Sequence, residues 1–347
     1  MKFLRYCIIL FCLFISNNPL FANTPVLNVY WWTGVVPDTV IRQFEKETGI
    51  KVNVSTYENN EVMYTKLRAV KQPGYDVIQP SSYMADRMQR QSMLEPLDKT
   101  LLPNWHHINP RFLHPIYDPQ SQYTAPFIWG VTGIFVNRHA ITDTRIQKWA
   151  DLWRPNYQDQ LMLLDDAREV FSMALISLGY SARDTNPEHI KQAYLKLKAL
   201  LPNIKVFASD TVVSIIIDED ATLGMAWNGD VYKANRENSR VQFILPKEGF
   251  VIWIDSLAIP KTAPHKENAY RFINFLLRPD IAKTITLYTR YATANLSAQK
   301  TLPAAIKDNP IIYPAEKLLR HGQVQVDVDE TTLALIEKYW EELKLGG

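Results

Sequence analysis

The chain contains little cysteine. Only Cys7 and Cys12 occur among its 347 residues, and both lie close to the N-terminus. The same segment starts with two basic residues and continues with an apolar run over residues 6–15 and then small and polar residues, as secretory signal peptides do. We expect cleavage after Ala22. The exported chain would then lack cysteine, which excludes disulfides and thiolate metal sites.

The apolar run is also too short for a membrane anchor. A bilayer-spanning helix needs about 20 apolar residues, and polar residues follow this run too early. Lipid attachment at Cys12 is disfavoured, because the preceding Phe11 is bulkier than such processing sites usually accept. We therefore expect an exported protein in a bacterial periplasm.

An excess of charge is missing as well. Without Lys2 and Arg5, 36 basic residues balance 36 acidic ones, and no basic run occurs. A nucleic-acid partner would require such an excess or stripe, so this class of partner is excluded. The chain also has no nucleophile elbow, P-loop or zinc motif. The adjacent His106 and His107 are interpreted as surface histidines rather than metal ligands.

Strand and helix patterns alternate along the exported 325 residues. Such alternation is typical of α/β layers around mostly parallel sheets, and the length suffices for two domains. No Gly/Ser-rich linker separates them, so we expect chain crossovers between the domains at residues 129–137 and 255–258. The predicted strands are 27–31, 51–57, 75–79, 161–164, 223–227 and 251–259, and the predicted helices are 37–48, 60–70, 82–91, 166–178, 187–200, 265–277 and 329–343.

Trp253 and Asp255 form the sharpest local feature. Residues at i and i+2 of a strand project from the same face, so the indole and the carboxylate would share one space. A carboxylate in so apolar a strand is costly unless a cation or hydrogen-bond donor satisfies it. Pairing with a structural arginine or lysine and contact with a cationic ligand are both open interpretations.

Asp166 and Glu169 follow a predicted strand and open a predicted helix. Their spacing is that of a capping box, in which Asp166 is the N-cap residue. The same turn is the end of an α/β sheet at which ligands usually lie, so a binding role is compatible with capping. Paired carboxylates among tryptophans are also typical of glycoside hydrolases, which makes that enzyme class the alternative function.

Aromatic residues recur near the predicted turns. Any one of them is most simply a core residue, but together with acids they would suit a cation with an apolar stem, since ring faces attract ammonium groups. These residues are Tyr30, Trp31, Trp32, Tyr83, Trp129, Trp227 and Tyr291.

Three long runs carry a family resemblance, at residues 44–52 (FEKETGIKV), 165–171 (DDAREVF) and 274–280 (NFLLRPD). The chain resembles the spermidine/putrescine-binding proteins of bacterial polyamine ABC transporters over nearly all of its exported length. The resemblance implies the two-lobed α/β fold of periplasmic binding proteins, with a ligand cleft between the lobes. We expect one lobe to comprise residues 23–133 plus 256–300, and the other 134–255 plus 301–347.

The resemblance also implies a binding site and a role. The implied function is non-enzymatic: capture of one polyamine and delivery to the permease and ATPase of an importer, by a monomer that uses no cofactor and no metal. Acids would pair the ligand's charges and aromatic rings would line its stem. The implied ligand-binding residues are Trp32, Thr33, Ser81, Tyr83, Asp166, Glu169, Trp227, Trp253, Asp255, Tyr291 and Gln325.

The chain departs from the family pattern after Thr33. Members that prefer spermidine commonly have an acid and then a tyrosine where this chain has Gly34 and Val35. In the loop of Tyr291, alanines stand where some members have prolines. Spermidine and putrescine both remain candidate ligands, and an amino acid or a metal chelate is a second class of solute for the same lobes.

Overall fold

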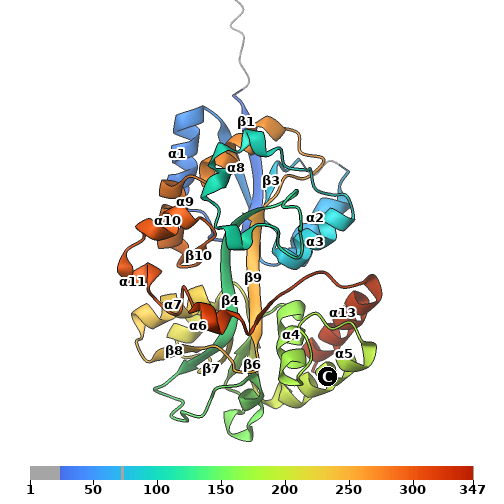
Figure 1. Ribbon diagram of the computed structural model, residues 1–347. Coiled ribbons are helices and arrows are strands. Elements are labelled where there is room, and N and C mark those ends of the chain that lie inside the picture. Colours follow the sequence, from blue (N-terminus) through green and yellow to red (C-terminus); the bar gives the residue numbers. More distant parts are fainter. Residues whose placement is uncertain (1–23, 72–73, 347) are drawn as a thin grey trace, which may run out of the picture.

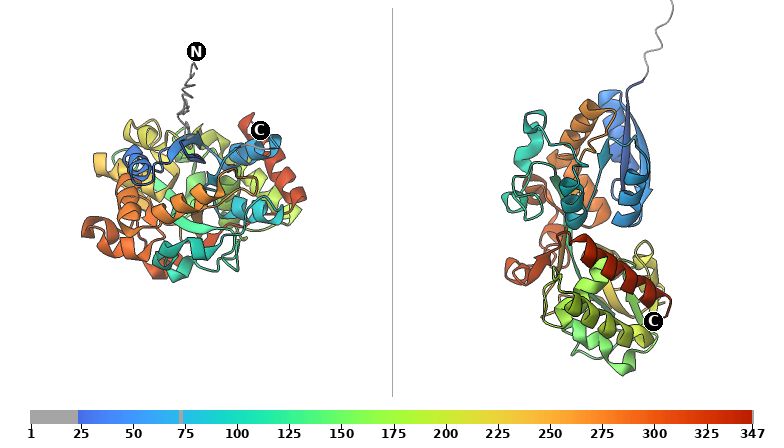
Figure 2. Two further views of the ribbon diagram at one scale, coloured as in Figure 1. Left: turned by 90° about the horizontal axis from the view of Figure 1, so that it is seen from above. Right: turned by 90° about the vertical axis from the view of Figure 1, so that its right-hand side faces the viewer.

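The computed structural model describes residues 24–71 and 74–346. The predicted signal peptide, residues 1–22, lies outside these ranges, so its cleavage remains a prediction. Figures 1 and 2 show two lobes joined by a narrow waist, with two long strands running through both lobes. Helices surround the sheets in each lobe, so the expected α/β class is correct.

The upper lobe of Figure 1 contains a three-stranded parallel sheet in the order β2-β1-β3. Its strands are β1 (Val26–Trp32), β2 (Lys51–Tyr57) and β3 (Val77–Ile78). The helices of this lobe are α1 (Asp38–Thr48), α2 (Asn60–Ala69), α3 (Ser82–Arg90), α8 (Lys266–Leu276) and α9 (Pro279–Thr289).

The first helix forms as its sequence predicts. Pro37 is the N-cap residue of α1, and Val40, Ile41 and Phe44 are its buried residues. The helix ends at Gly49, whose left-handed φ of 72° suits glycine because no Cβ is present. Its apolar face packs toward α8 and α9, and the helix also contacts β2 of the three-stranded sheet.

The second sheet joins the lobes. Its strands run in the order β11-β9-β4-β7-β5-β6, and β8 and β10 also pair with β4. The first half of β4 pairs with β9 and β10, and the second half pairs with β7 and β8, so β4 changes partners near Thr132. The strands are β4 (Ala125–Asn137), β5 (Leu161–Leu163), β6 (Ile204–Phe207), β7 (Leu223–Trp227), β8 (Val241–Ile244), β9 (Phe250–Leu257), β10 (Ala292–Thr293) and β11 (Gly322–Val324).

The lower lobe has its own core, in which β5, β7 and the second half of β4 pack against helices. Trp149, Tyr157, Phe135 and Phe171 are its largest fully buried side chains. The helices that contribute to this core are α4 (Ala167–Ser177), α5 (Pro187–Leu200), α6 (Val212–Ile217), α7 (Asn228–Glu237) and α13 (Glu330–Lys344). Of the other helices, α10 (Leu296–Thr301) packs against α9, and α11 (Ala304–Lys307) and α12 (Glu316–Leu319) add residues to the core that includes the upper lobe. Short 3-10 helices cover Lys99–Leu101, Pro103–His107, Pro110–Phe112, Trp149–Trp153, Pro155–Tyr157 and Leu201–Asn203.

The expectation of mostly parallel sheets holds for every strand pairing except those of β4, since β5 pairs parallel with β6 and β7, and β9 pairs parallel with β11. The small sheet is parallel throughout, but every pairing of β4 is antiparallel. The reason is that β4 and β9 connect the lobes in opposite directions. The expected crossovers at residues 129–137 and 255–258 fall on these two strands, and the lobe boundaries after residues 133 and 255 remain our proposal.

Candidate functional site

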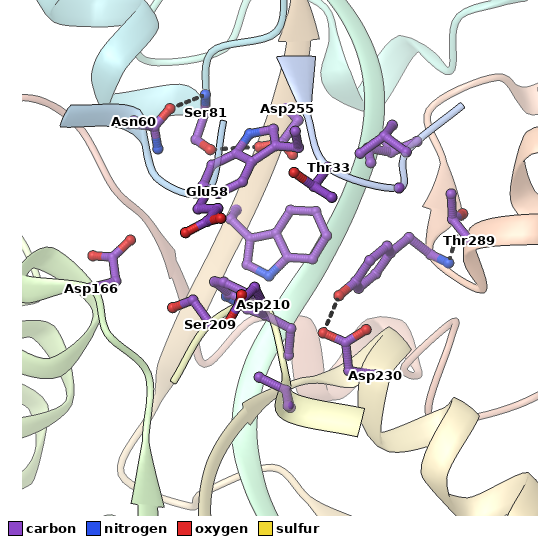
Figure 3. A pocket seen from close by; sticks show the side chains of 18 of the residues that line it. Thr33, Glu58, Asn60, Ser81, Asp166, Ser209, Asp210, Asp230, Asp255 and Thr289 are labelled. Carbon is purple, nitrogen blue, oxygen red and sulfur yellow. Dashed lines mark hydrogen bonds between the residues drawn. The ribbon is translucent and has the colours of Figure 1, made fainter. Parts of the chain in front are cut away.

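A cavity of about 480 Å³ lies between the lobes, and both lobes contribute to its wall. The expected site residues all line it, although they come from segments far apart in the sequence. From the upper lobe come Trp32, Thr33, Ser81, Tyr83 and Tyr291, from the lower lobe Asp166, Glu169 and Trp227, and from the connecting segments Trp253, Asp255 and Gln325. Figure 3 shows part of this wall.

Many of these side chains share one topological origin. Parallel strands end at the same edge of a sheet, and ligands of α/β proteins usually lie beyond that edge. Trp32 ends β1 and Trp227 ends β7, while Ser81 and Asp166 follow β3 and β5 within three residues. The carboxyl ends of strands in both sheets therefore face the same cavity.

The aromatic side chains form two groups along the cavity. Trp32 lies with its ring centroid 5.1 Å from that of Tyr57 and 6.4 Å from that of Trp227 across the cleft. Trp253 meets Tyr291 edge to face at 5.0 Å. The indole N–H groups of Trp32 and Trp253 are buried and have no hydrogen-bond partner within the described residues. These rings offer flat apolar walls and two unused donors.

Two glycines allow the rings to lie where they do. A Cβ on Gly130 of β4 would come within 2.2 Å of the indole of Trp253, and a Cβ on Gly229 of α7 would come within 2.3 Å of the ring of Tyr291. Real Cβ contacts are never so short, so any larger residue would displace one of these rings. The cavity wall therefore depends on both glycines.

Asp255 is a buried carboxylate on β9. Its Oδ1 accepts a hydrogen bond of 2.6 Å from the hydroxyl of Ser81, and the two residues form a β-bridge between the segments. Burial raises the pKa of Asp255 to about 7, although the Ser81 hydrogen bond favours the charged form. Asp255 forms no ion pair within the described residues, so the structural pairing left open by the sequence is not found there.

Asp166 and Glu169 lie together at the start of α4. Asp166 is the N-cap residue, and its carboxylate accepts a 3.0 Å hydrogen bond from the Glu169 amide, which is one half of the predicted capping box. The reciprocal bond from the Asp166 amide to the Glu169 side chain is not found in the described residues, because the Glu169 side chain lines the cavity. Burial raises the pKa of both acids, and repulsion from Asp166 raises the pKa of Glu169 further. Glu169 Oε2 is buried without a hydrogen-bond partner in the described part of the chain. Both acids are thus buried, and Glu169 also retains an unpaired oxygen.

Tyr83 is held as a neutral hydrogen-bonding group. Its hydroxyl donates to Glu61 at 2.9 Å and accepts from the Asn60 amide at 3.2 Å. Burial, together with the charge of Glu61, raises the pKa of Tyr83 well above its ordinary value. The guanidinium of Arg168, from the lower lobe, lies 5.0 Å from the centre of its ring. Tyr83 therefore contacts both lobes at the cavity wall.

Gln325 and Thr33 complete the expected set. The side-chain amide of Gln325 donates to the carbonyl of Arg168 and to the hydroxyl of Ser172, while the backbone carbonyl of Gln325 accepts a hydrogen bond from the Ser82 hydroxyl. It thus ties the lobes together on one side of the cavity. Thr33 is exposed, and its backbone N–H donates to the Tyr57 carbonyl at 3.2 Å.

The structure adds charged residues that the sequence did not single out. Asp230 and Lys233, both on α7, form an ion pair of 3.1 Å, and the Tyr291 hydroxyl donates to Asp230 at 2.8 Å. In Figure 3, Asp166 and Asp230 lie on opposite sides of the cavity, with Thr33 and Asp255 between them. The additional lining residues are Gly34, Val35, Tyr57, Glu58, Asn60, Ile128, Ser209, Asp210, Val212, Val213, Asp230, Lys233, Tyr288 and Thr289.

Some of these additional lining residues could have been predicted from the sequence. Glu58 follows β2 directly, and Ser209 and Asp210 follow β6 within three residues, so the rule that selects Ser81 and Asp166 also applies to them. Asp230 and Lys233 lie one turn apart within α7, which the sequence patterns did not predict.

The described residues contain no group of three or more histidine, cysteine or acidic side chains positioned for a metal ion. His106 donates from Nδ1 to the carbonyl of Pro103 in its own 3-10 turn at the surface, and His107 contacts Ser297. Nor do residues 24–71 and 74–346 include a helix of the length and apolarity that crossing a membrane requires.

The known proteins that this chain resembles are solute-binding proteins. The profile of a family described as bacterial extracellular solute-binding protein matches residues 39–314. The spermidine/putrescine-binding periplasmic protein of Salmonella typhimurium is 44% identical over 325 residues, which cover 94% of this chain and 93% of that protein. The putrescine-binding periplasmic protein PotF of Escherichia coli is 32% identical over 319 residues and 86% of each chain.

Solved structures extend the comparison to the fold. The spermidine/putrescine ABC transporter substrate-binding protein PotD of Streptococcus pneumoniae superimposes with a TM-score of 0.79 at 32% identity, covering 93% of this chain and 99% of that one. The expected two-lobed periplasmic binding protein fold is confirmed by this match. The glycoside hydrolase alternative receives no support from these comparisons.

Proposed function

The chain belongs to the bacterial extracellular solute-binding proteins, a family of non-enzymatic binding proteins, and we propose that it captures one linear polyamine, spermidine or putrescine, in the cavity between its lobes. The observation that carries this proposal is the set of Asp166, Glu169 and Asp255. All three are buried in one cavity, and none forms an ion pair within the described residues. Such carboxylates require either protons or an external cation.

The aromatic walls specify what kind of cation fits. A protonated polyamine consists of ammonium groups joined by methylene stems, so it needs carboxylates at intervals and apolar surface between them. Trp32, Trp227 and Trp253 supply ring faces, which attract ammonium groups by about 0.5 to 2 kcal/mol each. The cavity volume of about 480 Å³ lies within the range of small-molecule sites. An amino acid or metal chelate would require cationic or metal-ligating groups in place of these acids.

The proposal includes delivery to an ABC importer. The relatives named above are described as periplasmic binding proteins or as substrate-binding proteins of ABC transporters, which supports a periplasmic location and a permease and ATPase partner at the inner membrane. A ligand that contacts both lobes favours the closed state of the protein, and the closed state is what a transporter distinguishes from the empty one. We propose that the protein acts as a monomer without a metal.

Isothermal titration calorimetry of the purified protein with spermidine and putrescine tests the proposal. We expect binding of one molecule per chain by at least one of them, together with a rise in melting temperature. Binding should persist in EDTA, because no metal is involved. Arginine and a cello-oligosaccharide serve as controls for the amino-acid and carbohydrate alternatives.

The outcomes are separable. Heat and a melting shift with polyamines alone support the proposal. Heat with arginine only, or release of a product from the oligosaccharide, would replace it with one of the alternatives. Absence of any response to both polyamines, in protein whose melting is cooperative, would show that the cavity takes another solute.

A further inference from the structure

The two sides of the cavity differ in charge. Asp166 lies on one side, with Glu169 beside it at the start of α4, and Glu58 and Asp210 lie between that side and Asp230. On the other side, near Asp230 in Figure 3, the wall includes Lys233, which is the one lysine or arginine among the described residues that line the cavity. A ligand extended along the cavity therefore meets acids at one end and a cation at the other.

Asp230 does not offer a free carboxylate at that end. Its side chain is 12% exposed, and it already accepts hydrogen bonds from the Lys233 ammonium at 3.1 Å and the Tyr291 hydroxyl at 2.8 Å. The Lys233 nitrogen also lies 5.4 Å from the centre of the Tyr291 ring. A ligand ammonium arriving there would meet a like charge at a site whose acid and ring face are both in use.

The same end has room and a spare donor. The segment that follows Thr33 runs toward this side of the cavity in Figure 3, and it contributes Gly34 and Val35 to the wall. Apart from residues 33–35 themselves, no atom in the described part of the chain lies within 4 Å of the position a Cβ of Gly34 would take, and Val35 is apolar. A lysine ammonium has three N–H donors, so Lys233 can bond to Asp230 and still donate to a ligand oxygen.

From these contacts we propose, building on the polyamine-binding function, that the end of the cavity at Gly34 and Lys233 is a subsite for an uncharged, hydrogen-bond-accepting terminal group. The matching ligand class is a mono-N-acylated polyamine. Its free amines lie among Asp166, Glu169 and Asp255, its amide carbonyl accepts a hydrogen bond from Lys233, and its small acyl group occupies the space beside Gly34 and Val35.

Calorimetric competition between ligands of one length tests the subsite. Spermidine and its two mono-acetyl isomers share a backbone and differ by one terminal charge. We expect at least one isomer to bind the parent protein as tightly as spermidine or more tightly. Lys233→Met removes the like charge and releases Asp230, so it should shift the affinity ratio toward spermidine by about tenfold or more.

Two further variants separate charge from other effects. Arg236→Met removes the same charge from an exposed position on α7, and it should leave the ratio unchanged. Lys233→Gln keeps an N–H donor but loses the charge, so it should retain part of the affinity for the acetyl isomer. If Lys233→Met and Arg236→Met shift the affinity ratio equally, the shift is a long-range effect of charge, and the proposed subsite is wrong.

The same experiment distinguishes a failure of this inference from a failure of the proposed function. If spermidine binds the parent more tightly than both acetyl isomers and Lys233→Met leaves the ratio unchanged, the subsite is wrong while polyamine capture stands. If neither spermidine, putrescine nor an acetyl isomer binds, both proposals fall together.

Discussion

Asp255 and Asp230 are two aspartates of nearly equal burial on the wall of one cavity, with 6% and 8% of their surface exposed. Asp230 lies beside Lys233 and accepts a hydrogen bond from the Tyr291 hydroxyl. Within residues 24–71 and 74–346, Asp255 accepts hydrogen bonds only from the Ser81 hydroxyl and the Gln79 amide. Within the described residues, the fold thus places a cationic side chain beside Asp230 and none beside Asp255.

The difference shows which carboxylates are available to a ligand. A buried charge is costly unless it is paired, so an acid that the fold leaves unpaired takes up a proton or a cationic ligand. Burial accordingly raises the pKa of Asp255 to about 7. The internal ion pair of Asp230 satisfies that acid before any ligand arrives. Counting acids in the cavity therefore overstates the number of ammonium groups it can bind.

The largest expected effect comes from removing the unpaired charge. Asp255→Asn keeps the shape of the side chain but loses its charge, and losing one partner of a buried charge pair typically costs about 2 to 5 kcal/mol, or roughly 30- to 4,000-fold in affinity. Titration calorimetry with the tighter-binding polyamine measures the loss.

Asp230→Asn is the matched variant. It leaves Lys233 without its carboxylate, so its main consequence should be a lower melting temperature of the empty protein rather than the same loss of affinity. Asp255→Asn, in contrast, removes an unfavourable buried charge and should melt no lower than the parent at pH 8. Equal losses of affinity in the two variants would contradict the contrast between these acids.

The next effect concerns pH. A bound ammonium favours the charged form of Asp255, so binding should lower its pKa from about 7 and release protons. The contribution of Asp255 to affinity should therefore be constant above about pH 8 and fall by about tenfold per pH unit below pH 7. Asp166 and Glu169, whose pKa values burial also raises, should make the fall steeper, and Glu169, with a pKa that repulsion from Asp166 raises further, should begin to weaken binding at a higher pH. Titrations at pH 8, 7 and 6, each in two buffers of different ionisation enthalpy, measure both the affinity and the proton release.

The empty protein should respond in the opposite direction. The pKa of Asp255 is higher in the folded state than the value of about 4 in an unfolded chain. Its contribution to stability is present below about pH 4 and is lost as the pH rises through about 7. The melting temperature of Asp255→Asn should accordingly depend less on pH over this range than that of the parent. Parallel pH profiles would show that Asp255 is already charged without ligand.

The contrast between Asp255 and Asp230 is also one between a residue that a sequence pattern predicts and a residue that no pattern predicts. Trp253 and Asp255 were found because the i, i+2 spacing of a strand is a local rule, and the N-cap role of Asp166 follows from an equally local spacing. The roles of Thr33, Ser81 and Gln325 came only from the family resemblance. Their positions at the cavity depend on β-bridges and hydrogen bonds between distant segments, such as Ser81 with Asp255.

Asp230 and Lys233 were missed for a physical reason. They face the cavity because α7 starts directly after β7 and because Gly229 allows Tyr291 to lie against that start. Neither condition leaves a periodic signal in the sequence. The strand β4 was not predicted for a similar reason, and only a crossover was expected at residues 129–137, since all thirteen residues of β4 are buried and a strand covered on both faces shows no alternation.

The third expected effect concerns the aromatic side chains that lie beside the two acids. Trp253 shares a strand face with Asp255 and offers its ring to the cavity, whereas the Lys233 ammonium already lies near the Tyr291 ring. Loss of an ammonium contact with an indole face should weaken binding by about 2- to 30-fold. Trp253→Phe is the informative variant because it keeps a ring and avoids the large cavity that alanine would leave.

Calorimetry and melting of Trp253→Phe should show a smaller loss of affinity than Asp255→Asn in a protein of near-parent stability. A matched substitution, Trp153→Phe, lies in the lower lobe away from the cavity lining and should leave affinity unchanged. If Trp253→Phe binds like the parent, its ring is part of the core and does not face the ligand.

The smallest expected effect is at Gly34, where a new acid would make the two ends of the cavity more alike. Gly34 has a φ of 73°, a region that costs most L-residues roughly 1 kcal/mol or more but that aspartate and asparagine tolerate better, so Gly34→Asp is preferable to a glutamate. The new carboxylate would be exposed and would attract Lys233 as well as a ligand ammonium. We therefore expect only a few-fold shift in the affinity ratio toward spermidine over putrescine, of the size of an exposed ion pair. Gly34→Asn places the same shape on the same backbone without the charge, and comparing the two variants by competition titration isolates the charge. If Gly34→Asp and Gly34→Asn give the same ratio, residue 34 does not influence which polyamine is preferred, and discrimination at that end rests on Lys233.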